Sequence, residues 1–445
     1  MNKEFKEWQL RTIIVSMIGY ALFYFVRKNL SMAMPGMAID LGISKTELGF
    51  FLTLHGLVYG VSRFVNGIFA DRLNARFYMA IGLALCAIAN FAFGFGVDIA
   101  GCITGESSGT QFTNTLVLFM GITWVVNGLL QGSGFPPCAR LLTHWIPAKE
   151  LATKMSIWNT SHSIGAGMVV ILCGYIMEYL GVGEEHTGAW RWCFWIPSAI
   201  ALTGAAFLFI FLRDTPSSVG LPELPGVVKV KSKKTAETKA FLREKVFGNK
   251  FIWILGIANF FVYIVRFSML DCGPTLLKDS KMVDLRIAGW LVACFEVAGI
   301  VGMLIAGWVT DRYLKGRAHR TCVFCMLGAT FFAFLFWQLP NNAPIEIYFL
   351  VLFATGFFIY GPQALVGIAA ANQATKKAAA TANGVTGIFG YASTAVSGVG
   401  FGYVAQHYGW DLAYISIVVM SLVGVGVFML MWNAKADGYE ESITN

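Results

Sequence analysis

The sequence predicts an all-α membrane protein in which twelve transmembrane helices form two pseudo-symmetric bundles of six. Composition is the first reason: 56% of the 445 residues are hydrophobic and only 13% are charged, about half the charge density of a soluble protein, and the mean hydropathy is +0.63. The apolar residues also fall in blocks of about 20, enough for a helix to cross a hydrocarbon core of about 30 Å. Finally, the two halves of the chain repeat the same motifs.

Twelve apolar blocks are the predicted membrane-spanning helices. Long unbroken blocks with little alternation of period two argue against a β-barrel. The first block is too long for a cleaved signal peptide, and no small-residue cleavage site precedes a soluble domain. The blocks lie near residues 9–36, 47–70, 76–97, 114–143, 151–181, 190–212, 250–278, 286–311, 320–338, 344–373, 378–405 and 409–433.

A polar, basic stretch that contains proline separates the first six blocks from the last six. It reads RDTPSSVGLPELPGVVKVKSKKTAETKAFLREKV, residues 213–246. We therefore expect an N-terminal six-helix bundle over 1–212, a linker over 213–249 and a C-terminal six-helix bundle over 250–445.

The net charge of +8 could indicate a nucleic-acid partner, but the placement of the cations indicates a membrane topology instead. Lys and Arg gather in one set of connections, whereas the opposite set is mixed or acidic, as at Glu106 and Asp411. The positive-inside rule then places both termini and the linker in the cytoplasm, with the chain in the cell (inner) membrane. The basic connections are 71–76, 144–154, 213–250, 312–320 and 376–377.

The nine cysteines are scattered, mostly within the blocks, and the one CxxC spacing, Cys322 to Cys325, lies inside the apolar block 320–338. We interpret them as small apolar core residues and expect no metal site, no disulfide framework and no cofactor.

Two motifs recur in both halves at nearly the same separation. GIFADRLNAR (67–76) matches GWVTDRYLKGR (307–317), which places Asp71 and Asp311 240 residues apart. YFVRKNLSMAMP (24–35) matches YIVRFSMLDCGP (263–274), with its aligned residues 239 apart. Parallel six-helix repeats with a central site between them are one plan of membrane transporters.

Arg27 and Lys28 are the only charges between Arg11 and Asp40, and Arg266 is the counterpart of Arg27. Each of the two arginines follows a cation at the cytoplasmic edge by 16 residues, about 24 Å along a helix. An arginine near the bilayer centre costs about 2.5–3.5 kcal/mol on insertion scales. Snorkelling to a headgroup is the alternative for one such residue, but two repeat-related arginines at one depth indicate a polar site.

The balance of buried charges points to an anionic ligand. Four cations, Arg27, Lys28, Arg63 and Arg266, exceed two acids by two charges if all share one cavity. A phosphate dianion suits that excess, and the planar fork of arginine matches phosphate oxygens. The two acids are Asp271 and Glu296, which we expect to act as counter-ions, above all for Lys28.

Other polar side chains on the blocks are candidates for ligand contacts. His162, in WNTSHSIGAG, could hydrogen-bond the ligand and could change charge in the working pH range; packing against a carbonyl is its alternative. Residues with polar tips could contact sugar hydroxyls, and each could equally serve in packing. They are Tyr24, Tyr263, Trp158, Asn159, Tyr360, Gln363 and Tyr391.

The two DR loops and the glycine-rich helices are expected to serve conformational change. Asp71 and Asp311 begin helix–loop–helix corners, where they would fix contacts that form in one state and break in another. Glycines crowd the fourth, fifth and eleventh blocks (GLLQGSG, SIGAG, NGVTGIFGY). Small residues let helices approach closely and move against each other.

These features together resemble the major facilitator superfamily and, within it, the organophosphate:phosphate antiporters. The paired DR loops carry the likeness to the superfamily. More specific motifs recur in order over nearly the whole chain and look most similar to the hexose-phosphate branch, which includes a membrane sensor. They are GYALFYFVRKNL, YGVSRFVNGIFADRLNARF, QGSGFPPCARLLTHW, WNTSHSIGAG, YIVRFSMLD, FEVAG and YGPQALVGIAA.

The resemblance implies the fold of that superfamily and roles for several residues. The arginines of the first-helix VRK motif and of the seventh-helix VR motif bind phosphate in the family, and they match Arg27 and Arg266. The histidine of the WN..H motif matches His162. The acid that follows the seventh-helix arginine and the glutamate of FE.AG match Asp271 and Glu296.

In the family those two acids pair with the lysine that matches Lys28. The chain departs from the family pattern at Arg63, where a lysine is usual. It departs again in the eleventh block, where GYASTAVSGVG has neither the Asp nor the Lys of some hexose-phosphate carriers. GPQ at 361–363 looks more like the hexose-phosphate branch than the glycerol-phosphate one.

The sequence thus predicts a monomeric antiporter that exchanges a sugar phosphate, with a hexose 6-phosphate as first candidate, for inorganic phosphate by alternating access. Two alternatives stay open: a transporter-like sensor of external hexose phosphate that signals to a partner kinase, and a glycerol-3-phosphate:phosphate antiporter. An enzyme such as a phosphatase is not expected, because no paired carboxylate, Cys–His or Ser–His constellation has suitable spacing. A proton-coupled carrier for a neutral sugar would leave the cationic excess unexplained.

Overall fold

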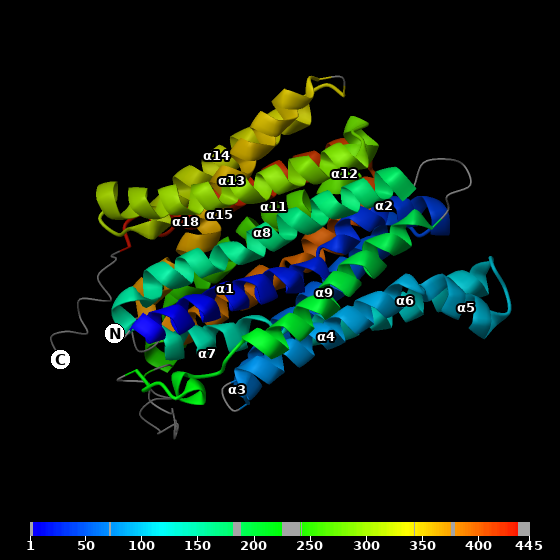
Figure 1. The fold of residues 1–445 in the computed structure, drawn as a ribbon. Helices are drawn as coiled ribbons and strands as arrows, with labels where there is room; N and C mark the ends of the chain where they lie inside the picture. Colours follow the sequence, from blue (N-terminus) through cyan, green and yellow to red (C-terminus); the bar gives the residue numbers. More distant parts are fainter. Residues whose placement is uncertain are drawn as a thin grey trace. The chain divides into compact units, whose positions relative to one another are not determined.

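The computed structural model describes residues 3–70, 73–180, 188–224, 241, 243–341, 343–374 and 379–434. These residues are helical and contain no strand, which confirms the predicted all-α class (Figure 1). They form two compact units, Met1–Val230 with Asp284–Trp290, and Lys231–Val283 with Leu291–Asn445. We call these unit 1 and unit 2. The domain limits expected from the sequence stay a prediction.

Unit 1 contains nine α-helices among its described residues before the linker. The first predicted block is divided into α1 and α2, and the fourth into α6 and α7, while the short α5 lies between predicted blocks. The helices are α1 (Lys3–Phe25), α2 (Asn29–Leu41), α3 (Lys45–Ala70), α4 (Ala75–Gly94), α5 (Gly96–Thr104), α6 (Thr110–Gln131), α7 (Phe135–Trp145), α8 (Ala148–Leu180) and α9 (Trp192–Phe211).

Unit 2 repeats the scheme, with two differences from the predicted blocks. The seventh block is divided into α11 and α12, and the eleventh contains a π-helical turn, η4 (Ala395–Gly400), of the kind that often occurs at functional sites. The helices are α11 (Lys250–Asp271), α12 (Gly273–Lys281), α13 (Leu285–Tyr313, which belongs to unit 2 from Leu291 onward), α14 (Ala318–Gln338), α15 (Ile345–Ala374), α16 (Ala379–Ala392), α17 (Phe401–His407) and α18 (Gly409–Met429).

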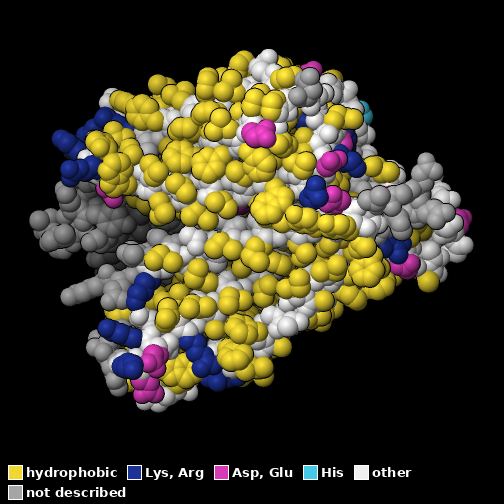
Figure 2. Space-filling model, turned by 45° about the horizontal axis from the view of Figure 1, so that its top comes forward, with side chains coloured by type: hydrophobic (Ala, Val, Ile, Leu, Met, Phe, Trp, Pro, Cys, Tyr) yellow, Lys and Arg dark blue, Asp and Glu magenta, His cyan; other side chains and the backbone are white. Residues whose placement is uncertain are grey.

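Length and hydropathy make most of these segments candidates for crossing a membrane. Eleven stretches of the described residues meet both criteria, and the predicted block 47–70 corresponds to α3, a helix of 26 residues. Large apolar side chains such as Ile88, Leu118 and Leu350 are exposed, and apolar side chains cover much of the face in Figure 2, with charged ones gathered toward its ends. This is the surface expected of a protein surrounded by lipid.

Within unit 1, α1 packs against α8 and α9, α4 against α9, and α3 against α6 (Figure 1). Large side chains at the contacts, including Phe23, Trp145 and Trp158, are almost completely buried. Glycine lets two backbones approach at Gly165, where an added Cβ would lie 2.4 Å from the Ala21 carbonyl oxygen. The core therefore fixes α1, which carries the first arginine.

Within unit 2, α11 packs against α15, α16 and α18, and α14 packs against α15 and α18. Lys281 at the end of α12 donates hydrogen bonds to the carbonyl oxygens of Trp337 (3.1 Å) and Leu339 (2.6 Å), near the end of α14. A cation at a helix C-terminus is favourable both for the carbonyl groups and for the helix dipole. The helix with the second arginine, α11, is thus surrounded by three others.

The first part of the predicted linker is folded onto unit 1. Asp214 accepts a hydrogen bond from the backbone N–H of Ala75 (2.9 Å), the first residue of α4, and forms an ion pair with Arg140 of α7 (3.0 Å). Leu221 is buried against the core of the unit. Residues 213–224 therefore connect the end of α9 to the start of α4 and to α7.

Candidate functional site

Arg27 lies where the first membrane-spanning segment is broken. α1 ends at Phe25 and α2 begins at Asn29, and the backbone N–H groups of Arg27 and Lys28 both donate to the Tyr24 carbonyl oxygen, at 3.2 and 2.9 Å. A break leaves backbone carbonyl groups without helical partners, which is costly inside a membrane.

Two amide side chains of α6 satisfy the carbonyl groups at this break. Asn127 donates from Nδ2 to the Val26 oxygen (3.1 Å) and to the Cys86 oxygen (3.1 Å). Gln131 donates from Nε2 to the Phe23 oxygen at 3.0 Å. Both side chains are buried, so α6 holds the segment that carries Arg27.

Replacing Asn127 with leucine is expected to lower the free energy of unfolding by about 1–3 kcal/mol, because two buried carbonyl groups lose a donor. Thermal unfolding of the purified protein measures the effect. Thr123→Val is the matched control on the same helix, since Thr123 donates only to carbonyl oxygens within α6, at 2.9 and 3.0 Å. Equal unfolding temperatures for the two variants would contradict the role of Asn127.

Aromatic rings surround the Arg27 guanidinium. Its Cζ lies 4.0 Å from the ring centroid of Tyr59 and 5.4 Å from that of Tyr24. Tyr24 in turn lies 5.7 Å from the ring of His162 on α8. Lys28, beside Arg27, is only 6% exposed. Cation–π contacts of this kind help to hold the Arg27 guanidinium in place.

The other candidates in unit 1 lie on α3 and α8. Arg63 places its Cζ 4.0 Å from the ring centroid of Phe135. His162 makes a close Nδ1 contact with the Asn159 carbonyl oxygen, and Ser163 Oγ lies 3.3 Å from its Nε2. Trp158 has no exposed surface, and its Nε1 donates to Ser16 at 3.1 Å. These contacts favour the packing alternative for Trp158.

In unit 2, Arg266 lies between a phenol and a carboxylate. Its NH2 group donates to the Tyr360 hydroxyl at 3.0 Å and lies 3.6 Å from Glu296 Oε1. All three residues are buried. Gly299 gives the phenol ring its place, because an added Cβ there would lie 2.4 Å from Tyr360. A counter-ion for Glu296 inside its own unit is therefore Arg266, whereas the pairing with Lys28 stays a prediction.

The remaining candidates of unit 2 are arranged around α11. Tyr263 lies 6.1 Å from the ring of Tyr391 on α16 and 6.0 Å from the Cζ of Arg266. Asp271, the last residue of α11, is 9% exposed. The side-chain oxygen of Gln363, one turn along α15 from Tyr360, is buried without a hydrogen bond. The structure thus brings Tyr263, Tyr360 and Arg266 together.

The two arginines match in sequence but differ in local structure. Arg27 lies in the break itself, next to Lys28, whose backbone angles are φ −96° and ψ −6°. In unit 2 the residue with nearly the same angles, φ −93° and ψ −6°, is Cys272, so Arg266 lies within regular helix before the break. The repeat therefore preserves the arginine but not the position of the break.

The structure describes only one of the two aspartates of the DR loops. Asp71 lies outside the described residues. Asp311 lies in the last turns of α13 and is exposed. Arg140 of α7 and Asp214 form an ion pair in unit 1 that the sequence did not predict. Asp71 and Asp311 keep their gating role only as a prediction.

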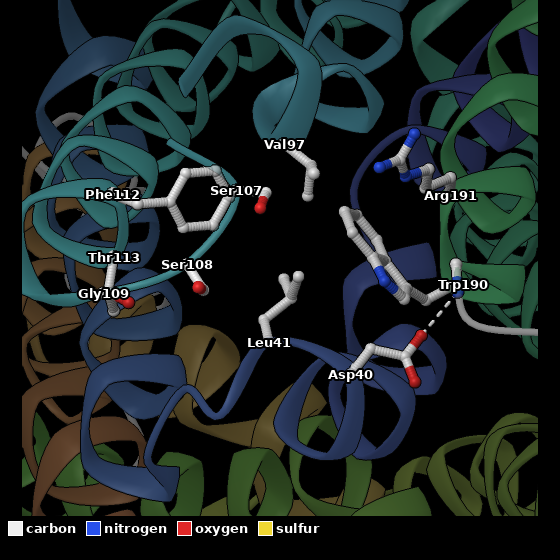
Figure 3. A pocket seen from close by; sticks show the side chains of 11 residues that line it. Asp40, Leu41, Val97, Ser107, Ser108, Gly109, Phe112, Thr113, Trp190 and Arg191 are labelled. Carbon is white, nitrogen blue, oxygen red and sulfur yellow. Dashed lines mark hydrogen bonds between the residues drawn. The ribbon is translucent and has the colours of Figure 1, made fainter. Parts of the chain in front are cut away.

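A cavity of about 410 Å³ lies in unit 1 among α2, α5, α6 and the residues before α9. Figure 3 shows the rings of Phe112 and Trp190 on opposite sides of it, with Asp40 accepting a hydrogen bond from the Gly188 N–H at 2.6 Å. Its lining cation, Arg191, pairs with Asp98 outside the cavity at 3.1 Å. The cavity thus lacks the cationic excess that a phosphate dianion requires.

Sequence reasoning missed His55 on α3. Its ring lies 6.4 Å from that of Tyr59 and 5.2 Å from that of Trp124, and the side chain is 5% exposed. Because Tyr59 also contacts Arg27, His55 belongs to the surroundings of the first arginine. Its signal in the sequence is the one histidine of the predicted block 47–70.

Comparison with known proteins identifies the family. The sequence profile of the Major Facilitator Superfamily matches residues 16–280 and 255–442. This chain belongs to that superfamily. A bacterial homologue of the human lysosomal transporter Spinster has the same fold, with a TM-score of 0.71 at 15% identity over 97% of each chain. A D-xylose–proton symporter gives a TM-score of 0.68 at 17% identity over 96% of this chain and 98% of the symporter.

Relatives in sequence place the chain in a branch of the superfamily. A probable hexose phosphate transport protein of Chlamydia trachomatis is 35% identical over 98% of this chain and 93% of that protein. The glycerol-3-phosphate transporter of Bacillus subtilis is 35% identical over 97% and 94%. The membrane sensor protein UhpC of Escherichia coli is 30% identical over 98% and 94%. The chain is therefore a multi-pass membrane transporter homologue of the organophosphate:phosphate antiporter branch, as its motifs predicted.

Proposed function

We propose that this superfamily member is an antiporter that exchanges a sugar phosphate, with a hexose 6-phosphate as first candidate, for inorganic phosphate. The observation that carries the proposal is the pair of repeat-related arginines, Arg27 and Arg266, each held by aromatic rings within its own unit. Guanidinium groups bind phosphate oxygens through paired hydrogen bonds. The relatives named for hexose phosphate and glycerol 3-phosphate support the same ligand class.

In this proposal the phosphoryl group binds to one arginine from each repeat, with Arg63 and His162 as further phosphate contacts. Candidates for the sugar hydroxyls are Tyr24, Tyr263 and others of the tyrosine and amide set predicted above. Without ligand, like charges oppose the approach of the two repeats, and a dianion removes that repulsion. The loaded carrier then changes conformation more readily than the empty one, and exchange follows by alternating access.

The topology and assembly belong to the same proposal. The basic connections and the positive-inside rule support cytoplasmic termini and an inner-membrane location. A single chain contains both arginines, which supports a functional monomer. The role proposed for the protein is transport, with no chemical conversion of the sugar phosphate.

Counterflow in proteoliposomes tests the proposal. Vesicles loaded with unlabelled phosphate should accumulate labelled phosphate, and external glucose 6-phosphate should drive labelled phosphate out. Competition by a panel of sugar phosphates, with glycerol 3-phosphate included, ranks the substrates. The ranking distinguishes a hexose-phosphate antiporter from a glycerol-3-phosphate antiporter. Failure of phosphate to exchange for any organophosphate would refute an antiporter.

A sensor of external hexose phosphate, which signals to a partner kinase, is the second candidate. The 30% identity to the membrane sensor UhpC over nearly the whole chain favours it. A sensor would use the same arginines to bind ligand, so binding alone does not separate the two functions. Saturable binding of glucose 6-phosphate by the purified protein without counterflow in vesicles would identify the sensor.

A further inference from the structure

Three arginines from different segments of unit 1 gather around the last turn of α9. Arg76, the second residue of α4, donates from Nε to the Phe209 carbonyl oxygen at 2.7 Å, and its Cζ lies 5.3 Å from the Phe209 ring. Arg213, just beyond α9, donates from Nη1 to two carbonyl oxygens of the same turn, both at 2.8 Å. Arg11 of α1 places its Cζ 5.3 Å from the Phe211 ring. Because α1, α4 and α9 pack against one another, three positive charges meet at one helix end.

Capping of the C-terminus of α9 accounts for only part of this cluster. A cation there is favourable for the helix dipole, but a guanidinium has more N–H groups than the contacts of Arg76 and Arg213 use. Arg11 donates no hydrogen bond to any described residue. None of the three forms an ion pair within the described part of the chain, and Asp214, next to Arg213, pairs with Arg140 instead at 3.0 Å. All three are half-buried, so the cluster keeps accessible, uncompensated positive charge.

Exposed aromatic side chains border the cluster on the surface expected to contact lipid. Phe77, Phe209 and Phe211 are 40–49% exposed, and the Trp8 ring lies 4.5 Å from the Cζ of Arg11. Tryptophan and arginine at the end of a membrane-spanning helix are typical of the level of the lipid headgroups. The proposed topology places this level at the cytoplasmic face, where anionic lipids attract arginine.

We propose that Arg11, Arg76 and Arg213 form a binding site for the headgroup of an anionic phospholipid. The phosphodiester accepts hydrogen bonds from guanidinium N–H groups that the protein does not use, and the acyl chains lie along the exposed apolar side chains of α4 and α9. A free phosphate ion would gain the charge contacts alone, so the exposed phenylalanines favour the lipid. The bound headgroup joins the ends of α1, α4 and α9, the first of which leads to the break at Arg27.

Equilibrium binding of labelled phosphatidylglycerol to the purified full-length protein in mixed detergent micelles tests the site. Each arginine removed should weaken binding about fivefold, and Arg76→Gln combined with Arg213→Gln about 25-fold, since a cation near an anionic lipid surface contributes about 1 kcal/mol. Arg11→Gln is the single variant of choice, because Arg11 donates no hydrogen bond to the described residues and its removal leaves their hydrogen bonds intact. The lipid should also raise the unfolding temperature of the wild type more than that of Arg11→Gln.

Arg191→Gln is the matched control for the lipid site. Arg191 also lies near an indole ring, 5.9 Å from that of Trp190, but it has a carboxylate partner, Asp98, at 3.1 Å, so its lipid binding should equal that of the wild type. Equal binding by the wild type, Arg11→Gln and the double variant would overturn the site, as would equal affinity for zwitterionic phosphatidylcholine. Displacement of the lipid by inorganic phosphate as readily as by unlabelled phosphatidylglycerol would also overturn it, in favour of a free anion. No sugar phosphate takes part, so the outcome is independent of the proposed antiport.

Discussion

Arg27→Lys and Arg266→Lys are each expected to lower phosphate exchange in proteoliposomes by at least about 100-fold. Lysine keeps the positive charge but offers a single ammonium group in place of the planar fork. A charge-assisted hydrogen bond contributes about 1.5–3 kcal/mol, so the loss of one or two such bonds to a phosphoryl group reaches about 3 kcal/mol, or about 100-fold. At position 266 the substitution also disturbs the 3.0 Å hydrogen bond from Arg266 to the Tyr360 hydroxyl.

Arg191→Lys is the matched control for both variants. Arg191 forms an exposed ion pair with Asp98 at 3.1 Å, and exposed pairs contribute about 0.2–1 kcal/mol, so exchange should stay within about threefold of the wild type. Initial rates of labelled phosphate counterflow, normalised to the amount of reconstituted protein, measure all three variants. Near-normal exchange by Arg27→Lys or Arg266→Lys would refute phosphate binding by paired arginines.

The membrane-spanning helices were predictable from the sequence, but the breaks in them were predictable only in part. Hydropathy marks an apolar stretch but does not show where the helix within it breaks. Several predicted blocks therefore contain more than one helix of the structure. Gly132 and Gly134 lie in the short stretch between α6 and α7, so the sequence signal for this break is local. The break at Arg27 has neither glycine nor proline; it depends on Asn127 and Gln131, about a hundred residues away in the sequence.

For the candidate site, too, the sequence predicted individual residues but not the contacts between distant ones. Repeat spacing predicted Arg266, the presence of an acid in an apolar block predicted Glu296, and a polar tip on a predicted helix made Tyr360 a candidate; the structure places the three together. Depth along a helix does not determine which way a side chain points, so the counter-ion of Glu296 could not be assigned from spacing. His55 was not predicted, because it lies in none of the motifs considered and has no counterpart at the repeat distance.

Glu296→Gln is expected to strengthen phosphate binding by about tenfold and to slow exchange by at least about tenfold. Glu296 is completely buried, 3.6 Å from the Arg266 guanidinium, so it competes with a phosphate for the same cation. At an effective dielectric constant of about 20, charges at about 4 Å interact by about 4 kcal/mol. Removing this competitor favours the anion, while slower release of the anion lowers the rate of exchange.

The same change should make the protein depend on its ligand for stability. Without the carboxylate, the buried Arg266 loses a counter-ion at 3.6 Å, and removing one partner of a buried ion pair destabilises a protein by about 3–5 kcal/mol. Bound phosphate compensates the charge, so phosphate should raise the unfolding temperature of Glu296→Gln more than that of the wild type.

Glu47→Gln serves as the control for Glu296→Gln, because the Glu47 carboxylate accepts hydrogen bonds from Ser44 at the start of α3, at 2.8 Å to both N and Oγ. Its phosphate affinity should equal that of the wild type. Equilibrium binding of labelled phosphate and exchange rates must be measured on the same preparations, since the argument concerns their opposite directions. Weaker phosphate binding by Glu296→Gln would mean that the carboxylate holds Arg266 in place for the anion and does not compete with it.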